Sequence, residues 1–407
     1  MLRGRGGCAG RIGIAVVTAT WALAGATPAW AQHDHAAAPD PSSDGWTWSA
    51  SARVFLNGNL QIKKFRDFRQ VESQNWFMAA GRRRAGAGEL RVFGMASLEP
   101  FTLRRLGSAQ TFQTGETLDG APLIDYQHPH ELLMGLGARY ERPLGGRARL
   151  ALGGGLVDAP ALGPTPFMHR ASADMHPTAP LSHHNLDASH TTFAVVTAGL
   201  GAGPWLVEAS AFHGGEPDEH RTDIADLGAL DSWSARVSWS ARGWRLQASG
   251  ARVHEPEVVD PGDQTRLRLS IEYAGQARGR DVALTLAWGD NRERFGNEAG
   301  WLVELAMSVG RRGVLYSRSE IVDKHILEAG GLHPPGFEHP HELSLVGALT
   351  GGYVHEAVRG RWGALAVGGD VTGHRTPANL WEPYGRPWSV HLYARWSAGA
   401  HPLPARP

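Results

Sequence analysis

Hydrophobic and polar residues alternate one by one over much of the chain after Trp46. In residues 232–240, Trp, Ala, Val and Trp occupy the odd positions, and serine or arginine occupies every even position. Residues 266–273 repeat this order with Leu, Leu, Ile and Tyr on one face. A period of two is typical of β-strands that have one apolar and one polar face. No long segment has the period of an amphipathic helix, so the sequence predicts an all-β fold.

Sixteen segments have this character, and most are about ten residues long, the length with which a tilted strand crosses a bilayer. They lie near residues 46–62, 74–83, 88–98, 131–141, 147–157, 191–200, 203–213, 231–240, 243–253, 264–275, 280–288, 299–309, 312–321, 343–354, 361–371 and 388–396.

The connections between these segments alternate in length. The short ones are rich in glycine or arginine and lie at 84–87, 142–146, 201–202, 241–242, 276–279, 310–311 and 355–360. The long ones lie at 63–73, 99–130, 158–190, 214–230, 254–263, 289–298, 322–342 and 372–387. Tryptophans gather near the strand ends, as membrane interfaces favour. These features predict a transmembrane antiparallel up-and-down β-barrel of about 16 strands, with short periplasmic turns and long histidine-rich outward loops.

A soluble β-sandwich or a β-propeller is the alternative to a membrane barrel. A sandwich needs no alternation of long and short connections, and a propeller shows a sequence repeat for each blade. The chain has no such repeat. We therefore expect the apolar face to meet lipid, with every backbone group paired around a closed sheet.

The first 31 residues have the pattern of a secretory signal peptide. Three arginines precede an apolar run at 12–26, and a small-residue cleavage motif ends at Ala31. The single cysteine, Cys8, lies inside this segment, so we expect no thiolate ligand and no disulfide in the mature chain. The predicted organisation is a signal peptide (1–31), a flexible N-terminal segment (32–45), an outer-membrane barrel (46–396) and a C-terminal tail (397–407).

Composition narrows the function classes further. Lys plus Arg and Asp plus Glu both number 40, so no basic field exists to hold a nucleic-acid backbone. The N-terminal apolar run is the only long one, which excludes a polytopic helical membrane protein. The expected partners are the lipid bilayer and the machinery that assembles barrels in the outer membrane of a Gram-negative bacterium, and we expect no nucleic acid.

The polar face of the strands carries charges of both signs. Its arginines are Arg53, Arg236, Arg245, Arg266, Arg268, Arg318 and Arg395, and its carboxylates are Glu208, Glu272, Glu304 and Glu320. The excess of arginine fits a mild preference for anions in the lumen. A ladder of salt bridges that braces the wall fits the same residues equally well.

Histidine is frequent, with 20 residues, and its distribution is uneven. Fifteen of the seventeen histidines between the first and last segments lie in the long connections or at their edges: His128, His130, His169, His176, His183, His184, His190, His213, His220, His254, His325, His333, His339, His341 and His374. The long connections share one end of the predicted barrel. We therefore expect a histidine-rich outward mouth.

One motif occurs twice, as His-Pro-His-Glu-Leu at 128–132 and at 339–343. Proline favours an extended backbone at the residue before it. In an extended chain, residues i and i+2 point to the same side about 7 Å apart. Each copy is thus predicted to present two imidazoles to one metal ion, and neutral imidazole suits zinc or copper.

A second histidine-rich stretch runs from Met168 to His190 and adds the thioethers of Met168 and Met175, which would favour copper(I). The candidate metal ligands are His128, His130, His169, His176, His183, His184, His339 and His341. The other interpretation is that these histidines form hydrogen bonds that hold a packed loop plug together.

Catalysis is a third hypothesis, because Ser182-His183 and Ser189-His190 supply the residue types of a hydrolase. Adjacent residues on an extended chain point in opposite directions, however, so neither pair forms a dyad by itself. The Gly-x-Ser-x-Gly elbow is also missing. We therefore assign no catalytic and no cofactor-binding residue, and we expect a protein that is not an enzyme.

Several blocks together resemble a largely uncharacterised family of predicted Gram-negative outer-membrane β-barrel proteins. They lie at 127–132 (QHPHEL), 161–164, 167–173 (FMHRASA), 179–184 (APLSHH), 214–219 and 384–390. The resemblance spans most of the mature chain and implies a barrel in the outer membrane, without implying an activity. The content of His and Met is also similar to that of outer-membrane copper-resistance proteins of the B type, although only His33-Asp34-His35 stands in place of their Met/His-rich N-terminal segment.

The leading hypothesis is an outer-membrane channel or small-solute transporter whose histidine-rich mouth is a candidate zinc or copper site. The alternative is a structural or receptor-like barrel that transports nothing because hydrogen-bonded loops plug it. An outer-membrane hydrolase is the third hypothesis.

Overall fold

The computed structural model describes residues 45–64, 67–224, 227–257, 262–293, 296–325 and 343–399. The predicted signal peptide, almost all of the segment 32–45 and most of the predicted tail lie outside these residues. His339 and His341 of the second His-Pro-His copy lie outside them too. Within the described ranges, no helix is both long and apolar enough to span a bilayer.

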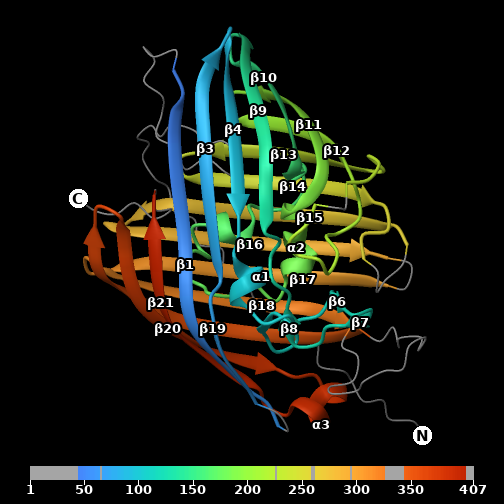
Figure 1. Cartoon of the computed structure of the whole chain (residues 1–407), viewed down its shortest axis with the longest axis vertical. Coiled ribbons are helices and arrows are strands. Elements are labelled where there is room, and N and C mark those ends of the chain that lie inside the picture. The colour runs from blue at the N-terminus through green and yellow to red at the C-terminus, as the bar shows by residue number, and fades with distance from the viewer. Residues whose placement is uncertain are drawn as a thin grey trace, which may run out of the picture.

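Sixteen antiparallel strands form one closed barrel, which confirms the predicted fold class (Figure 1). In barrel order they are β1 (Thr47–Ile62), β3 (Asn75–Ala85), β4 (Gly88–Ala96), β9 (Leu133–Gly145), β10 (Ala148–Asp158), β11 (Thr192–Ala202), β12 (Trp205–Phe212), β13 (Ser232–Ala241), β14 (Trp244–Val253), β15 (Gln264–Ala277), β16 (Arg280–Arg292), β17 (Asn297–Val309), β18 (Gly313–His325), β19 (Leu343–Gly360), β20 (Gly363–Arg375) and β21 (Trp388–Ala398).

The barrel closes between its first and last strands. β1 pairs with β21 from Ala52 opposite Ala398 to Ile62 opposite Trp388. On its other side, β1 pairs with β3 and then with the short β2 (Phe68–Glu72), which continues the line of β3 towards the long-loop end. The connection predicted at 63–73 therefore contains wall strand as well as loop.

The strand positions agree with the sixteen predicted segments, although several strands are longer than predicted. Residues 355–360 were predicted as a turn, and this is wrong. They belong to β19, because they pair with β20 across a β-bulge between Glu356 and Val358, and the chain reverses at Arg361 and Trp362. Ser397 and Ala398, assigned to the tail from the sequence, continue β21 because β1 offers them pairing partners.

The two faces of the wall differ as the alternation predicts. On β13, Val237 points outward and is 39% exposed, whereas Ser238 points inward and is 5% exposed. Outward tryptophans form two groups, with Trp205 and Trp362 near the short turns and Trp233 and Trp301 near the long loops. An apolar outer band between two aromatic girdles is the surface that a bilayer requires.

In the part of the chain that the structure describes, helices lie only in the long loops and have three or four residues each. The β4–β9 loop contains α1 (Glu99–Thr102) and the short strands β5 (Ser108–Ala109), β6 (Thr117–Leu118), β7 (Ala121–Pro122) and β8 (Tyr126–Gln127). The β10–β11 loop contains η1 (Phe167–His169), α2 (His183–Leu186) and η2 (Ala188–His190), and the β20–β21 loop contains η3 (Ala378–Leu380) and α3 (Trp381–Tyr384).

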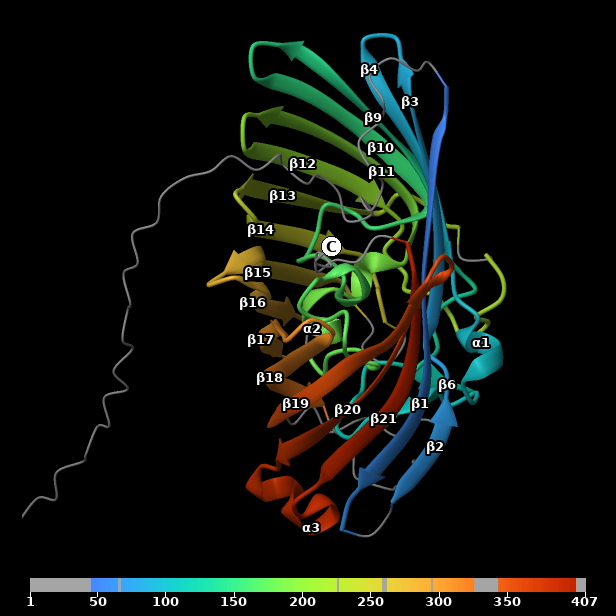
Figure 2. The same ribbon diagram turned by 90° about the vertical axis from the view of Figure 1, so that its left-hand side faces the viewer.

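The β10–β11 loop, residues 159–191, folds into the barrel and is called the plug loop below. Nearly all of its residues are buried. Figure 2 shows this segment and α2 inside the curve of the wall. The plug loop therefore brings its histidines inward, to where the overlying loops can contact them.

Candidate metal centre

Glu116 and His128 are positioned by small β-structures in the β4–β9 loop. Glu116 directly precedes the β6–β7 hairpin, whose turn residues Asp119 and Gly120 both have positive φ, as a tight two-residue turn requires. The carboxylate of Glu219 accepts hydrogen bonds from both of these backbone N–H groups, at 2.7 and 3.1 Å. His128 directly follows β8, which pairs with β5.

His184 is positioned by α2 of the plug loop, which packs against β16 and β17. Gly289 and Gly300 are paired neighbours on these two strands. A Cβ at Gly289 would lie 1.8 Å from the backbone oxygen of Asn185, and one at Gly300 would lie 2.9 Å from the Cβ of Asn185. Two glycines in register thus leave a notch in the wall, and α2 occupies it.

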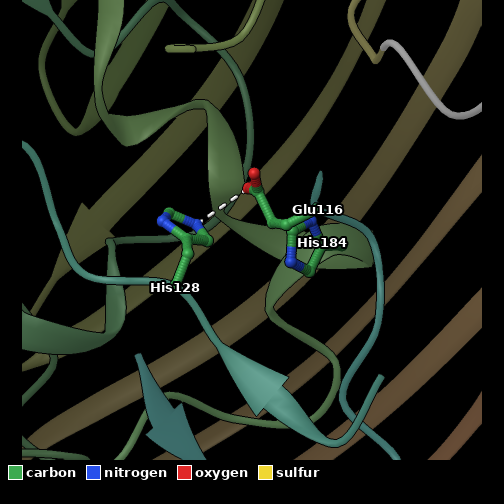
Figure 3. A group of neighbouring side chains, drawn as sticks. All are labelled: Glu116, His128 and His184. Carbon is green, nitrogen blue, oxygen red and sulfur yellow. Dashed lines mark ion pairs between the residues drawn. The ribbon is translucent and has the colours of Figure 1, made fainter. Parts of the chain in front are cut away.

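Glu116, His128 and His184 meet where the β4–β9 loop lies over the plug loop, and they are called the mouth cluster below (Figure 3). Their potential ligand atoms all lie within 4.8 Å of one another. The Nε2 atom of His128 is 2.8 Å from a carboxylate oxygen of Glu116, and the rings of His128 and His184 are 6.4 Å apart. A carboxylate and two imidazoles form a ligand set that suits zinc and copper(II).

Burial favours the metal-binding form of both imidazoles. Burial lowers the pKa of His128 even though the charge of Glu116 opposes this effect. Burial and the nearby ammonium group of Lys324 lower the pKa of His184 well below its ordinary value. Neutral imidazole is the form that binds a metal, so neither ring must lose a proton near neutral pH.

A second group of potential ligands shares His184 and adds Glu216 and Glu257, again with all ligand atoms within 4.8 Å. Both carboxylates contact Arg266, at 3.0 and 3.7 Å. Burial and the charge of Glu116 raise the pKa of Glu216. Burial and the charge of Glu216 raise the pKa of Glu257 well above its ordinary value. Carboxylates and cations therefore both surround His184, with Arg266 beside the two glutamates and Lys324 near the ring.

The structure does not bring His128 and His130 together in one group of potential ligands. The Nδ1 atom of His130 lies 2.8 Å from a carboxylate oxygen of Glu99. Its ring packs beside His190, with centroids 5.5 Å apart. The two rings of the motif therefore have different carboxylate partners, Glu116 for His128 and Glu99 for His130.

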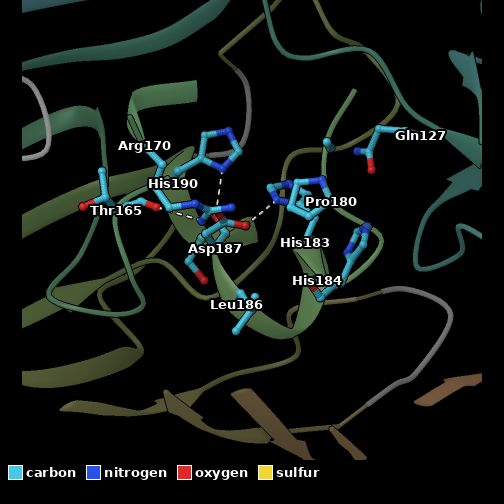
Figure 4. A network of polar contacts seen from close by, with 12 residues as sticks. Gln127, Thr165, Arg170, Pro180, His183, His184, Leu186, Asp187 and His190 are labelled. Atoms are coloured by element: carbon cyan, nitrogen blue, oxygen red, sulfur yellow. Dashed lines mark hydrogen bonds and ion pairs between the residues drawn. The ribbon is translucent and has the colours of Figure 1, made fainter. Parts of the chain in front are cut away.

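His183 also belongs to this neighbouring group rather than to the mouth cluster. Its Nδ1 atom is 2.7 Å from a carboxylate oxygen of Asp187, and Nδ1 of His190 donates a hydrogen bond of 2.9 Å to the Asp187 backbone oxygen (Figure 4). Burial alone would raise the pKa of Asp187, but the guanidinium group of Arg170 and the contact with the His183 ring outweigh burial and lower it.

The other predicted ligands are not gathered at the mouth cluster. His169 lies in η1, and the ring of His176 packs against Tyr316 of β18 with centroids 4.7 Å apart. Neither belongs to a group of potential ligand side chains in the described ranges. Met168 and Met175 are buried in an apolar cluster with Phe55 and Tyr393, so the thioethers predicted to favour copper(I) serve packing. His339 and His341 lie outside the described residues.

Ion pairs anchor the plug loop to strands far apart around the barrel. Arg170 is 1% exposed and contacts Asp187 at 2.6 Å and Glu304 of β17 at 3.0 Å. Asp174 contacts Arg53 of β1 at 2.8 Å and Arg395 of β21 at 2.9 Å. Many of the charged strand residues that were predicted to face the lumen therefore contact the plug loop.

Beside the plug, a polar cavity remains along β9 to β14. Its lining includes Arg139, Glu208, Arg236, Ser238 and Arg245. Glu208 and Arg236 form an ion pair of 2.9 Å across neighbouring strands. The interior thus combines a braced wall with a charged space that the plug leaves free.

The serines considered for catalysis bond elsewhere. The Ser182 hydroxyl donates a 2.7 Å hydrogen bond to Glu320, and the Ser189 hydroxyl accepts one of 2.9 Å from Arg266. These contacts support the interpretation of both serines as anchors of the plug loop.

Sequence reasoning missed Glu116, Glu216 and Glu257. Glu216 lies in one of the blocks that mark the resemblance, but no spacing relates it to the others. The sequence gives only a weak signal for these residues. Each is a glutamate in a long connection, and the long connections lie at the same end of the predicted barrel as the histidines.

No protein-family profile matches the chain, and no curated protein matches it in sequence. Its fold is similar to that of solved outer-membrane porins. The anion-selective porin from Comamonas acidovorans has a TM-score of 0.54 and 9% identity, with 87% of this chain and 100% of the porin covered. OmpF of Salmonella typhi, in a complex with daunomycin, has a TM-score of 0.53 and 8% identity, with 87% and 98% covered. OprB of Pseudomonas putida, at high pH, has a TM-score of 0.51 and 10% identity, with 87% and 94% covered.

Proposed function

We propose that this chain is an outer-membrane channel for small polar solutes, exported by a cleaved signal peptide and inserted by the barrel assembly machinery. Its short turns face the periplasm and its long loops face outward. The observation that carries the proposal is the polar inner face of a closed sixteen-strand wall, with a charged cavity that the plug loop does not fill. An apolar outer band and a polar interior are the features of barrels that conduct water and solutes.

A barrel that transports nothing is the second candidate. It is favoured by the burial of the plug loop and by its anchors on β1, β17 and β21. In this case the fixed loop interactions would serve a structural or receptor role at the surface, and the lumen would stay closed.

Conductance across a planar lipid bilayer separates the two candidates. We expect refolded protein to give discrete current steps, smaller than those of a variant in which a short glycine–serine linker replaces residues 159–191. We expect small steps because the plug loop occupies much of the lumen and the cavity lined by β9 to β14 is small, about 50 Å³. If the full chain gave no current and the plug-deleted variant gave large steps, the channel proposal would be wrong and the plugged scaffold would be supported.

We further propose that the outward mouth binds a divalent transition metal, as the clustering of histidines predicts. The mouth cluster supports this proposal, because its two imidazoles and one carboxylate lie close together in their metal-binding forms. Zinc is the natural probe, since it accepts nitrogen and oxygen ligands in a tetrahedral site.

Elemental analysis of refolded protein, loaded with zinc and desalted, should find one zinc per chain. His128→Ala should remove this zinc, whereas His130→Ala should retain it, because His130 contacts Glu99 and not the mouth cluster. His220→Ala, at an exposed histidine of a neighbouring loop, is the matched control. Equal loss of zinc in the His128 and His130 variants would contradict this assignment, and no zinc in the parent chain would refute metal binding.

A further inference from the structure

Four potential metal ligands from three other loops lie close to His184 of the plug loop. Glu116 and His128 come from the β4–β9 loop, Glu216 comes from the β12–β13 loop, and Glu257 comes from the β14–β15 loop. They form two groups that share His184, and within each group the ligand atoms lie within 4.8 Å of one another. An ion bound by the mouth cluster would therefore lie next to the second group of carboxylates.

The contact between His128 and Glu116 fits either a protonated His128 ring or a metal ion between the two groups. Nδ1 of His128 is 2.8 Å from the carbonyl oxygen of Pro129, so this nitrogen carries a hydrogen and donates it. In the neutral ring, Nε2 then presents its lone pair to the carboxylate oxygen of Glu116, 2.8 Å away. Two acceptors at this distance need a proton or a metal ion between them. A histidine that ligates a metal typically has this arrangement, with its other nitrogen donating to a backbone carbonyl.

His184 supplies an independent sign of a missing ligand. Its side chain is buried, and among the described residues its Nδ1 atom has no hydrogen-bond partner. Gly115 of the β4–β9 loop packs so close that a Cβ there would lie 2.9 Å from this nitrogen. A buried polar atom without a partner is unfavourable, and an ion bound by the ring would offset this cost.

The groups around His184 carry charges of both signs. The carboxylates of Glu116, Glu216 and Glu257 can attract a divalent ion. Arg221 contacts Glu116 at 3.4 Å, and Arg266 contacts Glu216 at 3.0 Å and Glu257 at 3.7 Å. A divalent ion at the mouth cluster would therefore share these carboxylates with the two guanidinium groups.

We propose that one divalent transition-metal ion, bound by Glu116, His128 and His184 and completed by Glu216 or Glu257, clasps two outward loops to the plug loop and closes the mouth. This inference rests on the proposed metal binding and adds the ligand set and its consequence. With the ion bound, the plug loop is fastened from above as well as to the wall. Without it, only contacts within the protein hold the loops over the plug.

The test compares zinc with a chelator in two assays on the full refolded chain. Zinc should lower bilayer conductance and slow cleavage of the outward loops by a protease, and the chelator should reverse both effects. His184→Ala should abolish both responses. Glu216→Gln combined with Glu257→Gln should raise the zinc concentration needed for either response by about tenfold, the low end of the cost of losing a supporting group at a metal site. Glu356→Gln, at the short-turn end of the barrel, is the matched control.

The outcomes separate this inference from the proposals on which it rests. One zinc per chain without any change in proteolysis or conductance would overturn the clasp and leave metal binding intact. A zinc response that persists in His184→Ala, or that is unchanged in the double glutamine variant, would overturn the ligand set. Because proteolysis is measured on every variant, the inference remains testable even if the parent barrel does not conduct.

Discussion

Arg170→Met should destabilise the barrel by about 3–5 kcal/mol, the usual cost of removing one partner from a buried ion pair. The Arg170 side chain is fully buried and contacts both Asp187 and Glu304. Methionine retains most of the side-chain length but leaves the two carboxylates without their shared guanidinium group. The free energy of unfolding in urea, measured on refolded protein in detergent, reports this loss.

The same variant should also release the plug loop, since Arg170 joins that loop to β17. We expect larger bilayer currents and faster proteolysis within residues 159–191 than in the parent chain. Arg105→Met is the control, because Arg105 forms an exposed ion pair with Asp119, and exposed pairs contribute little to stability. Similar effects of the two replacements would show that the buried pair does not anchor the plug.

Val237→Arg should cost about 2–4 kcal/mol, as a charge near the bilayer midplane does in barrels. Val237 lies in the middle of β13 and points outward. Ser238→Arg is the matched control, because the next residue points inward and lines the polar cavity near Glu208. The measurement is folding into lipid vesicles of defined composition as a function of urea. Equal tolerance of arginine at both positions would argue against a membrane-embedded wall.

The wall of the barrel was predictable because its signal is local. Each strand residue faces either the outside of the barrel or its lumen, and apolar and polar residues alternate accordingly in residues 232–240. The ends of the strands were less predictable. β19 continues through residues 355–360 because β20 supplies pairing partners, which a reading of β19 alone does not reveal.

The candidate site was predictable only in part. The extended His-Pro-His backbone and the gathering of histidines at one end follow from local chemistry and from the topology of the barrel. The partner of each ring does not follow from them. His128 meets Glu116 and His130 meets Glu99, because the fold of the β4–β9 loop brings a different carboxylate to each ring.

The sequence by itself determined the all-β fold, the strand order and the end of the barrel at which the histidines collect, since these depend on the polarity and length of consecutive segments. Only the tertiary structure decided that residues 159–191 fold inward. This depends on contacts with the wall such as the hydrogen bond from Arg170 to Glu304, which lies 134 residues away in the sequence. It likewise decided that Glu116, Glu216 and Glu257 surround His184. These residues lie in separate loops, and no periodicity relates loops that meet only when the barrel closes.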